Sequence, residues 1–257
     1  MKKTLNKKGI FFTLTVIAAI SLFLIGYTFY VNFGDRSTTH ERINTLNTFI
    51  FSTEENLERQ IFISGFRALF IMQTEAVEKG IYIPNATASF NELLLSGSFN
   101  GTTQPIMIGS TFPDIKDAIQ QKANKVNANI NLNNPVIYIT QSDPWNVDVV
   151  LKVNFDAQDQ GKLVTWNKTQ TYISKIPIKD FEDPLYLINT AGVITNKIEK
   201  TLFTFNETNI ANLNNHTTNK YYKANTQAPS YLNRLQGINN ADSNGIESFV
   251  YIPQLSN

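Results

Sequence analysis

The chain has 257 residues, enough for one large domain or two small ones, and its 22 basic and 21 acidic residues leave a net charge of +1. This balance excludes a free, strongly basic nucleic-acid-binding domain, and a hydrophobic content of 42% excludes a disordered chain. The sequence contains no cysteine and only two histidines, so we expect no disulfide, no metal centre built on Cys or His, and no cofactor.

The first 33 residues have the pattern of a membrane anchor. A basic leader over residues 1–9 carries four lysines before the first acidic residue, namely Lys2, Lys3, Lys7 and Lys8. Ile10–Val31 then lacks any charged residue, and a helix of this length spans about 33 Å, close to the hydrocarbon thickness of a bilayer. The sequence therefore predicts a transmembrane helix over residues 10–33. The lysine bias places the N-terminus in the cytoplasm and the rest of the chain outside the cell membrane.

A cleaved secretory signal peptide is the alternative interpretation of this segment. The apolar core of such a peptide is about 7–15 residues long and is followed by small residues at the cleavage site. Here the apolar run is longer and ends with bulky residues, Tyr27 to Phe33, without an Ala-x-Ala-like site. The pattern favours retention of the segment as an anchor.

The junction between leader and apolar run resembles a known processing signal. Lys7-Lys8-Gly9, followed by the apolar residues Ile10 to Ile17, is similar to the class III signal of type IV pilin-like proteins. The resemblance implies cleavage between Gly9 and Ile10, and partners that pack through the N-terminal helix, either copies of the same chain or other pilin-like proteins. Many bacterial members carry Glu at the fifth mature position, where this chain has Leu14, so minor and archaeal pilin-like proteins are the better match. An uncut signal anchor remains the alternative.

Residues 34–80 predict a long amphipathic helix outside the membrane. Gly34 to Ser37 should interrupt the helix, and Thr38 with Glu41 has the spacing of a capping box that restarts it. Apolar residues then recur at spacings of three and four up to Lys79, and Gly80 provides a stop. The segment Ile61–Met72 is apolar on nearly all sides, so we expect it to pack under a sheet, with Arg67 extending its charged head to solvent or to a surface carboxylate.

Residues 81–257 predict an extracytoplasmic α+β domain. A helix should start at Thr111, and three segments rich in β-branched and aromatic residues predict an antiparallel meander on which the long helix packs: Val136–Thr140, Val147–Phe155 and Leu163–Ile178. Asn127–Asn134 is predicted to be a polar connector. The Asn-rich C-terminal region predicts irregular structure, with short helices near Thr190–Lys200 and Pro229–Leu235 and a strand at Ser248–Leu255.

Five Asn-x-Ser/Thr triplets on the predicted outer side are candidate glycosylation sites. They begin at Asn85, Asn100, Asn167, Asn206 and Asn215. A chain this rich in asparagine contains such triplets by chance, so their number is not evidence of selection.

Other candidate sites have ordinary structural explanations. The segment Asn240–Gly245 has the oxygen spacing of the first half of a calcium loop but lacks the acidic residues at its ends, so an Asx-rich turn is expected. His40 and His216 lack metal partners at helical spacing and are expected on the surface. Trp145 and Trp166 are expected to pack on the sheet, with a sugar-binding platform as the alternative.

These patterns favour a membrane-anchored surface protein without catalytic activity, either pilin-like or an envelope assembly component. Nucleophile-elbow, phosphate-loop and dinucleotide-binding motifs are missing from the sequence, and no nucleic-acid partner is expected. Two alternatives stay open: a signal-anchored binding module that does not polymerise, and a membrane-tethered hydrolase whose acidic residues come together only in the fold.

Overall fold

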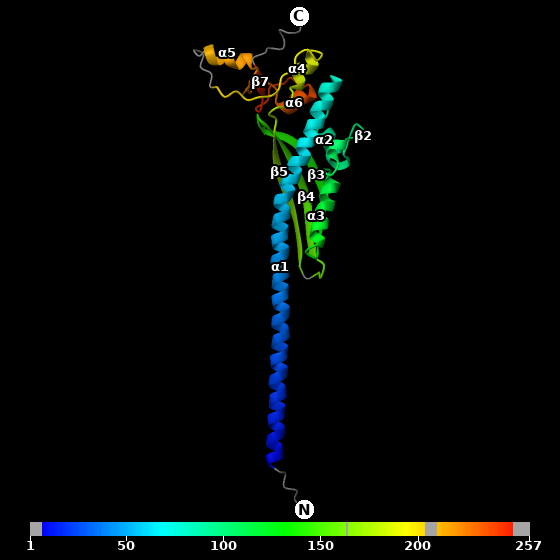
Figure 1. The fold of residues 1–257 in the computed structure, drawn as a ribbon, viewed down its shortest axis with the longest axis vertical. Coiled ribbons are helices and arrows are strands. Elements are labelled where there is room, and N and C mark those ends of the chain that lie inside the picture. Colours follow the sequence, from blue (N-terminus) through cyan, green and yellow to red (C-terminus); the bar gives the residue numbers. More distant parts are fainter. Residues whose placement is uncertain (1–6, 163, 204–209, 249–257) are drawn as a thin grey trace, which may run out of the picture.

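The computed structural model describes residues 7–162, 164–203 and 210–248, with only the backbone at 7–11, 13, 31–39 and 210. The protein is α+β, as predicted. One very long helix, α1 (Lys7–Lys79), runs along a domain that contains a three-stranded antiparallel sheet and several short helices (Figure 1). At 1.5 Å per residue, α1 is about 110 Å long.

The predicted break at Gly34 to Ser37 is wrong, because α1 continues through these residues without interruption. A single glycine in a helix costs only about 1 kcal/mol relative to alanine, and no proline adds a steric block. A helix that already extends on both sides gains a hydrogen bond for each residue it adds, and this gain offsets the cost of the glycine. The predicted end is confirmed: α1 stops at Lys79, and Gly80 follows with φ +63°.

The sheet is the predicted meander, with longer strands than the sequence indicated. It consists of β3 (Ala128–Asp143), β4 (Asn146–Asp159) and β5 (Thr165–Pro177), in the order β3-β4-β5. The predicted connector Asn127–Asn134 largely belongs to β3, because Ile130 and Leu132 alternate with exposed asparagines and face the core. The expectation of a polar loop is therefore wrong, and the reason is the alternation of apolar residues along the strand.

The C-terminal half of α1 packs on one face of the sheet, which we call the inner face. The close contact lies at Gly65, where an added Cβ would come within 2.8 Å of Val149 Cγ2 on β4. Ser174 of β5 donates a hydrogen bond to the carbonyl oxygen of Glu58 at 2.8 Å. Most of Ile61–Met72 is buried as predicted, but four apolar side chains of this segment are exposed, which the sequence did not indicate.

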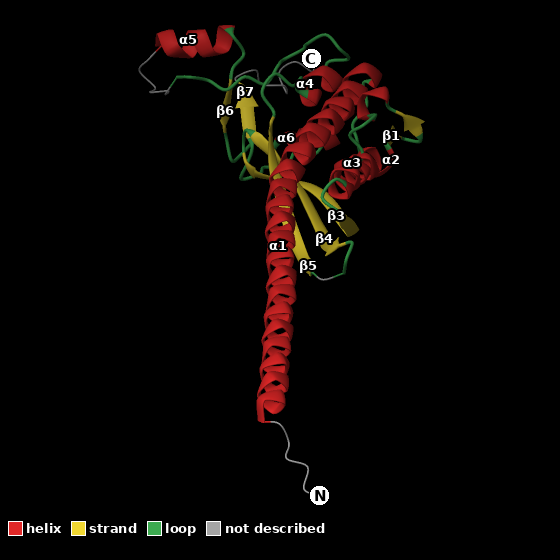
Figure 2. Ribbon diagram, turned by 60° about the horizontal axis from the view of Figure 1, so that its bottom comes forward, coloured by secondary structure: helices red, strands yellow, loops and turns green. Residues whose placement is uncertain are grey.

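The helix α3 (Phe112–Asn124) packs on strand β3 and also contacts α1 (Figure 2). Its start is the predicted one: Thr111 and Asp114 form a reciprocal capping box, which leaves fewer unpaired amides in the first turn. Before α3 the chain forms α2 (Ala86–Ser96), the short hairpin of β1 (Ser98–Phe99) and β2 (Thr102–Thr103), and the 3₁₀ helix η1 (Pro105–Met107).

The C-terminal region has more regular structure than predicted. It contains α4 (Pro184–Asn189), α5 (Ile210–Thr218), β6 (Tyr222–Ala224), α6 (Tyr231–Gln236) and β7 (Ile246–Ser248). The helix expected near Thr190–Lys200 is wrong, because the helical turn lies before it and is capped by Asp183. The helix expected at Pro229–Leu235 is confirmed as α6. Of the strand expected at Ser248–Leu255, only Ser248 lies in the described residues.

Candidate functional site

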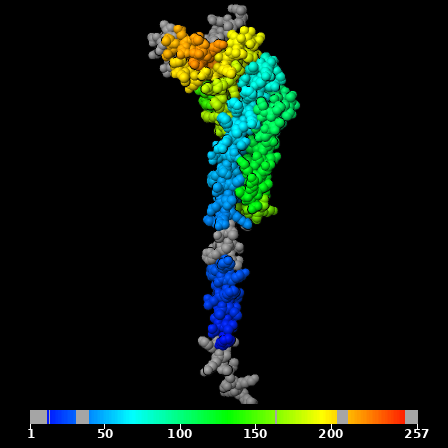
Figure 3. Space-filling view, in the orientation of Figure 1, coloured from blue at the N-terminus to red at the C-terminus, as the bar shows by residue number. Residues whose placement is uncertain are grey.

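The N-terminal half of α1 stands clear of the domain (Figure 3). Every described side chain from residue 12 to residue 30 is exposed, and most are large and apolar. Leu22, Phe23, Leu24 and Ile25 are 53% to 73% exposed, although four successive helical residues point in four directions 100° apart. An amphipathic helix would offer one apolar stripe to a core. The described side chains of this half are apolar on all sides of the helix.

The hydroxyl group of Thr28 bonds to the backbone of its own helix. Thr28 Oγ1 donates to the carbonyl oxygens of Leu24 and Ile25, both at 2.8 Å. Within the described residues, none of the helices combines the length and the apolarity of a candidate membrane span. The transmembrane helix predicted over residues 10–33 is therefore not supported by this part of the chain, and its side chains at 10, 11, 13 and 31–33 lie outside it.

The predicted processing residues and two of the predicted topology residues lie at the start of α1. Gly9 and Ile10 lie in the first turn of α1, which begins at Lys7 and includes Lys8. Only the backbone of these residues is described, and Lys2 and Lys3 lie outside the described residues.

Four of the predicted glycosylation sites are exposed, and the fifth, Asn206, lies outside the described residues. Asn100 lies in the turn between β1 and β2, with φ +49°. Asn85 is the N-cap of α2 and accepts a hydrogen bond from Ala88 N, and the amide of Asn167 donates to Asp156 within the sheet. Asn215 lies in α5, so the predicted loop at this position is wrong.

Arg67 has a structural role that differs from the prediction. The prediction placed its guanidinium in solvent or against a surface carboxylate. Instead, the guanidinium donates to the carbonyl oxygens of Ile106 at 3.0 Å and Ile108 at 3.4 Å and to the hydroxyl of Ser110. These groups lie in and just after η1. One cation thus ties a loop of the domain to α1, which sequence reasoning could not find because carbonyl acceptors leave no sequence signal.

The most buried polar cluster joins α4, α6 and β6. Arg234 and Asp183 are 2% and 0% exposed, and Arg234 Nη1 lies 2.6 Å from Asp183 Oδ2. The hydroxyl of Tyr222 also donates to Asp183 Oδ2, at 2.8 Å, and Asn196 Nδ2 donates to that hydroxyl at 2.9 Å. Asp183 Oδ1 accepts from the backbone amide of Leu185 at 3.0 Å. This network holds the Asn-rich region together from within.

Burial sets the protonation of this cluster. Burial by itself would lower the pKa of Arg234, but the neighbouring Asp183 carboxylate raises it overall, so the guanidinium stays charged. Burial, and then the same carboxylate, raises the pKa of Tyr222, and of Tyr186 to about 12, so both hydroxyls stay protonated. The cluster therefore has the chemistry of a fixed ion pair with neutral donors, which suits a structural role.

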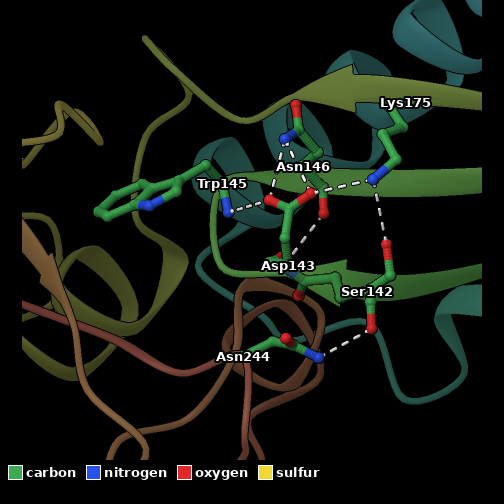
Figure 4. A network of polar contacts seen from close by, with 7 residues as sticks. Ser142, Asp143, Trp145, Asn146, Lys175 and Asn244 are labelled. Carbon is green, nitrogen blue, oxygen red and sulfur yellow. Dashed lines mark hydrogen bonds and ion pairs between the residues drawn. The ribbon is translucent and has the colours of Figure 1, made fainter.

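The turn between β3 and β4 is fixed by a second polar network (Figure 4). Asp143 Oδ1 accepts from Trp145 N at 2.8 Å and from Asn146 Nδ2 at 2.9 Å, and Lys175 Nζ lies 3.4 Å from Asp143 Oδ2. Burial opposes charge on Asp143, but these donors lower its pKa overall. The Trp145 ring points away from the network, is half-buried, and has Lys200 Nζ 5.4 Å from its centroid. Trp145 packs on the core as expected, while Trp166 is 37% exposed.

The candidate calcium loop forms the expected Asx turn. Asp242 Oδ1 accepts from Asn244 N at 2.8 Å, and its Oδ2 accepts from Ser230 and Asn233, both at 3.0 Å. Over the part of the chain that the structure describes, no group of three or more His, Asp or Glu side chains could hold a metal ion.

A groove of about 600 Å³ crosses α3 and the lower end of the sheet and contains two carboxylates, Asp117 and Asp156. This pair bears on the hydrolase alternative, because a hydrolase would need acidic residues that come together in the fold. Asp156 accepts hydrogen bonds from the amides of Asn133, at 3.0 Å, and Asn167, so its oxygens brace neighbouring strands.

His216 is buried in α5, so the predicted surface position is wrong, whereas His40 is exposed as predicted. The apolar side of α5 carries the imidazole inward, where its ring meets Tyr221 edge-on with centroids 6.3 Å apart. Burial, and then the charge of Lys223, lowers the pKa of His216.

We expect this burial to make α5 less stable in mild acid. The unfolded segment has the ordinary histidine pKa near 6.5 and the folded segment a lower one, so below about pH 6.5 the unfolded form binds more protons. Stability should fall as pH drops from 7.5 through this range. Hydrogen–deuterium exchange of α5 amides should speed up between pH 7.5 and 5.5, after correction for the intrinsic rate, and His216→Phe should remove the change. His40→Phe is the control and should behave like the parent chain; an unchanged acid response in His216→Phe would contradict the assignment.

No protein family model, no curated protein sequence and no solved structure matches this chain.

Proposed function

We propose that the chain is a single-pass, membrane-anchored surface protein without catalytic activity, a pilin-like or envelope assembly component. Its N-terminus lies in the cytoplasm and its α+β domain outside the membrane. One observation carries the proposal: the half of α1 that projects from the domain is exposed and apolar on all sides. Such a surface is unfavourable in water, at roughly 25 cal/mol for each Å² of apolar area, and hydrocarbon or other apolar helices would cover it.

Two further features support this orientation. The uncharged stretch Ile10–Val31 has the length of a span, and the lysines that precede it occupy the side expected to face the cytoplasm. At the other end of α1, the helix passes directly into the core of the domain. A rigid helix that is apolar in one half and packed on a sheet in the other would hold the domain close to the membrane surface.

The pilin-like form of the proposal depends on processing at Gly9. The matched residues are the basic pair Lys7-Lys8, the glycine and the apolar run, while Leu14 departs from the common pattern. This departure fits minor and archaeal pilin-like proteins better than the common bacterial pattern. The second candidate is an uncut signal-anchored module that does not polymerise. Both candidates share the anchor and the orientation, and they differ in the first residue of the mature chain.

We test the proposal with the full chain expressed in a host that carries a class III signal peptidase. After flotation of the membranes, N-terminal sequencing should return Ile10 for a pilin-like protein and Met1 for an uncut anchor. External protease should digest the domain in intact spheroplasts, and Lys7→Glu with Lys8→Glu should perturb this orientation. Lys116→Glu with Lys122→Glu, on α3, is the matched control. Full-length chain in the soluble fraction, or a domain protected from external protease, would refute the proposal.

A further inference from the structure

The chain contains two Asn-Gly pairs, Asn100-Gly101 and Asn244-Gly245, and such a pair has a reactivity of its own. The backbone nitrogen of the glycine attacks the side-chain carbonyl carbon, Cγ, of the asparagine, and ammonia leaves with the proton of that nitrogen. Water then opens the resulting succinimide to aspartate or isoaspartate. Glycine permits the attack because it has no side chain that hinders the approach. The two pairs have the same local sequence, so the fold decides which of them reacts.

The fold holds every reacting group of the Asn244 pair. The side-chain amide of Asn244 donates to the carbonyl oxygen of Gln141 at 2.8 Å. The Gly245 nitrogen, which would have to attack, donates to the carbonyl oxygen of Asp242 at 2.9 Å. Gly245 is also enclosed, since an added Cβ would come within 2.0 Å of the carbonyl oxygen of Ala228. Neither group can move toward the other without breaking these contacts, so this pair is protected.

The Asn100 pair has a more open setting. Asn100 and Gly101 form the two-residue turn between β1 and β2, with φ +49° and +75°, and both residues are exposed. Among the described residues, no hydrogen-bond partner holds the side-chain amide of Asn100, in contrast to that of Asn244. In the same part of the chain, no atom beyond its neighbours lies within 4 Å of the position that a Cβ of Gly101 would take. The side chain and the glycine therefore have room to react.

One carboxylate, that of Glu92 on α2, ties down the backbone of this turn. Glu92 Oε1 accepts from the Gly101 amide at 2.7 Å and from the Ser98 hydroxyl at 3.1 Å, and Oε2 accepts from the Asn100 amide at 3.1 Å. The Gly101 amide is the main cause that lowers the pKa of Glu92, so the acceptor is charged at neutral pH. Hydrogen bonds to a charged acceptor are roughly twice as strong as neutral ones.

These bonds oppose the first step of the reaction. The Gly101 nitrogen has to lose its proton and turn toward Asn100 Cγ, whereas its bond to Glu92 holds the proton and directs the N–H to α2. The amide on the other side of Asn100 is held by the same carboxylate, so rotation of the backbone between the two amides is restricted. A carboxylate with a lowered pKa is also a weak base, so Glu92 restrains the nitrogen more than it activates it.

We propose that Asn100 is a site of spontaneous deamidation in the folded protein, that the Glu92 carboxylate slows the reaction, and that Asn244 is protected from it. The product adds a negative charge to the turn beside Glu92, and isoaspartate also adds a methylene group to the backbone, so the reaction loosens the β1–β2 hairpin. It also removes the side-chain amide to which a glycan at this triplet would be attached. None of these groups belongs to the projecting half of α1, so the site is independent of the proposed function.

Peptide mapping by mass spectrometry tests the site in the full chain. The chain is produced in a host without N-glycosylation and incubated at neutral pH in water enriched in oxygen-18, which labels only the molecules that react during the incubation. We expect Asn100 to be labelled roughly tenfold faster than Asn244 in the folded chain, because hydrogen bonds have to break before Asn244 can react. In urea the two rates should be equal, since only the local sequence then matters.

The role of Glu92 is tested by substitution. Glu92→Ala should raise the Asn100 rate about tenfold, because the bonds to a charged acceptor are lost, and should leave the Asn244 rate unchanged. Glu92→Gln keeps a neutral acceptor and should give an intermediate rate. Glu78→Ala, at an exposed glutamate of α1, is the matched control and should behave like the parent chain. The thermal unfolding midpoint of each variant shows that the domain is folded.

Four outcomes would overturn the proposal. Equal labelling of Asn100 and Asn244 in the folded chain would show that the fold does not distinguish the two pairs. A folded chain without label at Asn100, over a time in which the chain in urea is fully labelled, would exclude the site. A slower Asn100 rate in Glu92→Ala would show that the carboxylate acts as a base, and an unchanged rate would show that it has no part in the reaction.

Discussion

Replacing Ile17 and Leu24 together by lysine should release the chain from membranes. Both residues lie near the middle of the uncharged stretch and are exposed, at 64% and 57%. A lysine at the centre of a membrane helix costs about 2.5–3.5 kcal/mol on the insertion scale, so the pair opposes insertion by roughly 5–7 kcal/mol. We expect the parent chain to float with liposomes in a density gradient and the double variant to stay at the bottom or in the soluble fraction.

The control for this experiment is Leu202→Lys, at an apolar residue of the domain that is 90% exposed. This variant should float like the parent chain, because the added charge stays in water. Flotation also separates membrane-bound protein from aggregate, which sediments. A double variant that floats as well as the parent chain would show that this half of α1 is not the part that holds the chain on the membrane.

Removing one partner of the buried Asp183–Arg234 pair should strongly destabilise the domain. Arg234→Met keeps most of the side-chain stem but leaves Asp183 charged and buried. Among the described residues, the hydroxyl of Tyr222 and the amide of Leu185 are then its remaining donors. Breaking such a pair costs about 3–5 kcal/mol. In a domain of this size 1 kcal/mol corresponds to roughly 2–4 °C, so we expect the unfolding midpoint to fall by about 6–20 °C.

The double variant Asp183→Asn with Arg234→Met tests the origin of this loss. It should be more stable than the sum of the single effects predicts, since the unpaired buried charge is gone. Arg59→Ala is the control, because Arg59 and Glu55 form an exposed i, i+4 pair at 3.8 Å that contributes at most about 0.5 kcal/mol. A loss below 1 kcal/mol in Arg234→Met would contradict the structural role of the pair.

The predicted elements that proved correct are those with a repeating or local signal. The alternation of Val147, Val149 and Leu151 marked the central strand, and the capping residues Thr111 and Asp114 marked the start of α3. Gly80 ended the long helix because only a residue that tolerates positive φ fits there. Each of these signals acts within a few residues along the chain.

The errors arise where distant contacts or cooperative structure override a local signal. Gly34 weakens a helix locally, but α1 continues because the helix on both sides is already formed. The asparagines before residue 134 suggested a loop, but pairing with β4 makes this segment a strand. His216 has polar neighbours in sequence and is nevertheless buried, because the rest of α5 turns it inward.

The sequence by itself determined that the chain is α+β, with one long N-terminal helix and an antiparallel meander, because hydrophobic periodicity and turn residues report which face of each element is covered. Only the tertiary structure decided which polar groups meet. Asp183 and Arg234 are 51 residues apart, and Arg67 reaches a loop about 40 residues away. Such contacts depend on the packing of whole elements, and neither partner carries a local sign of the other.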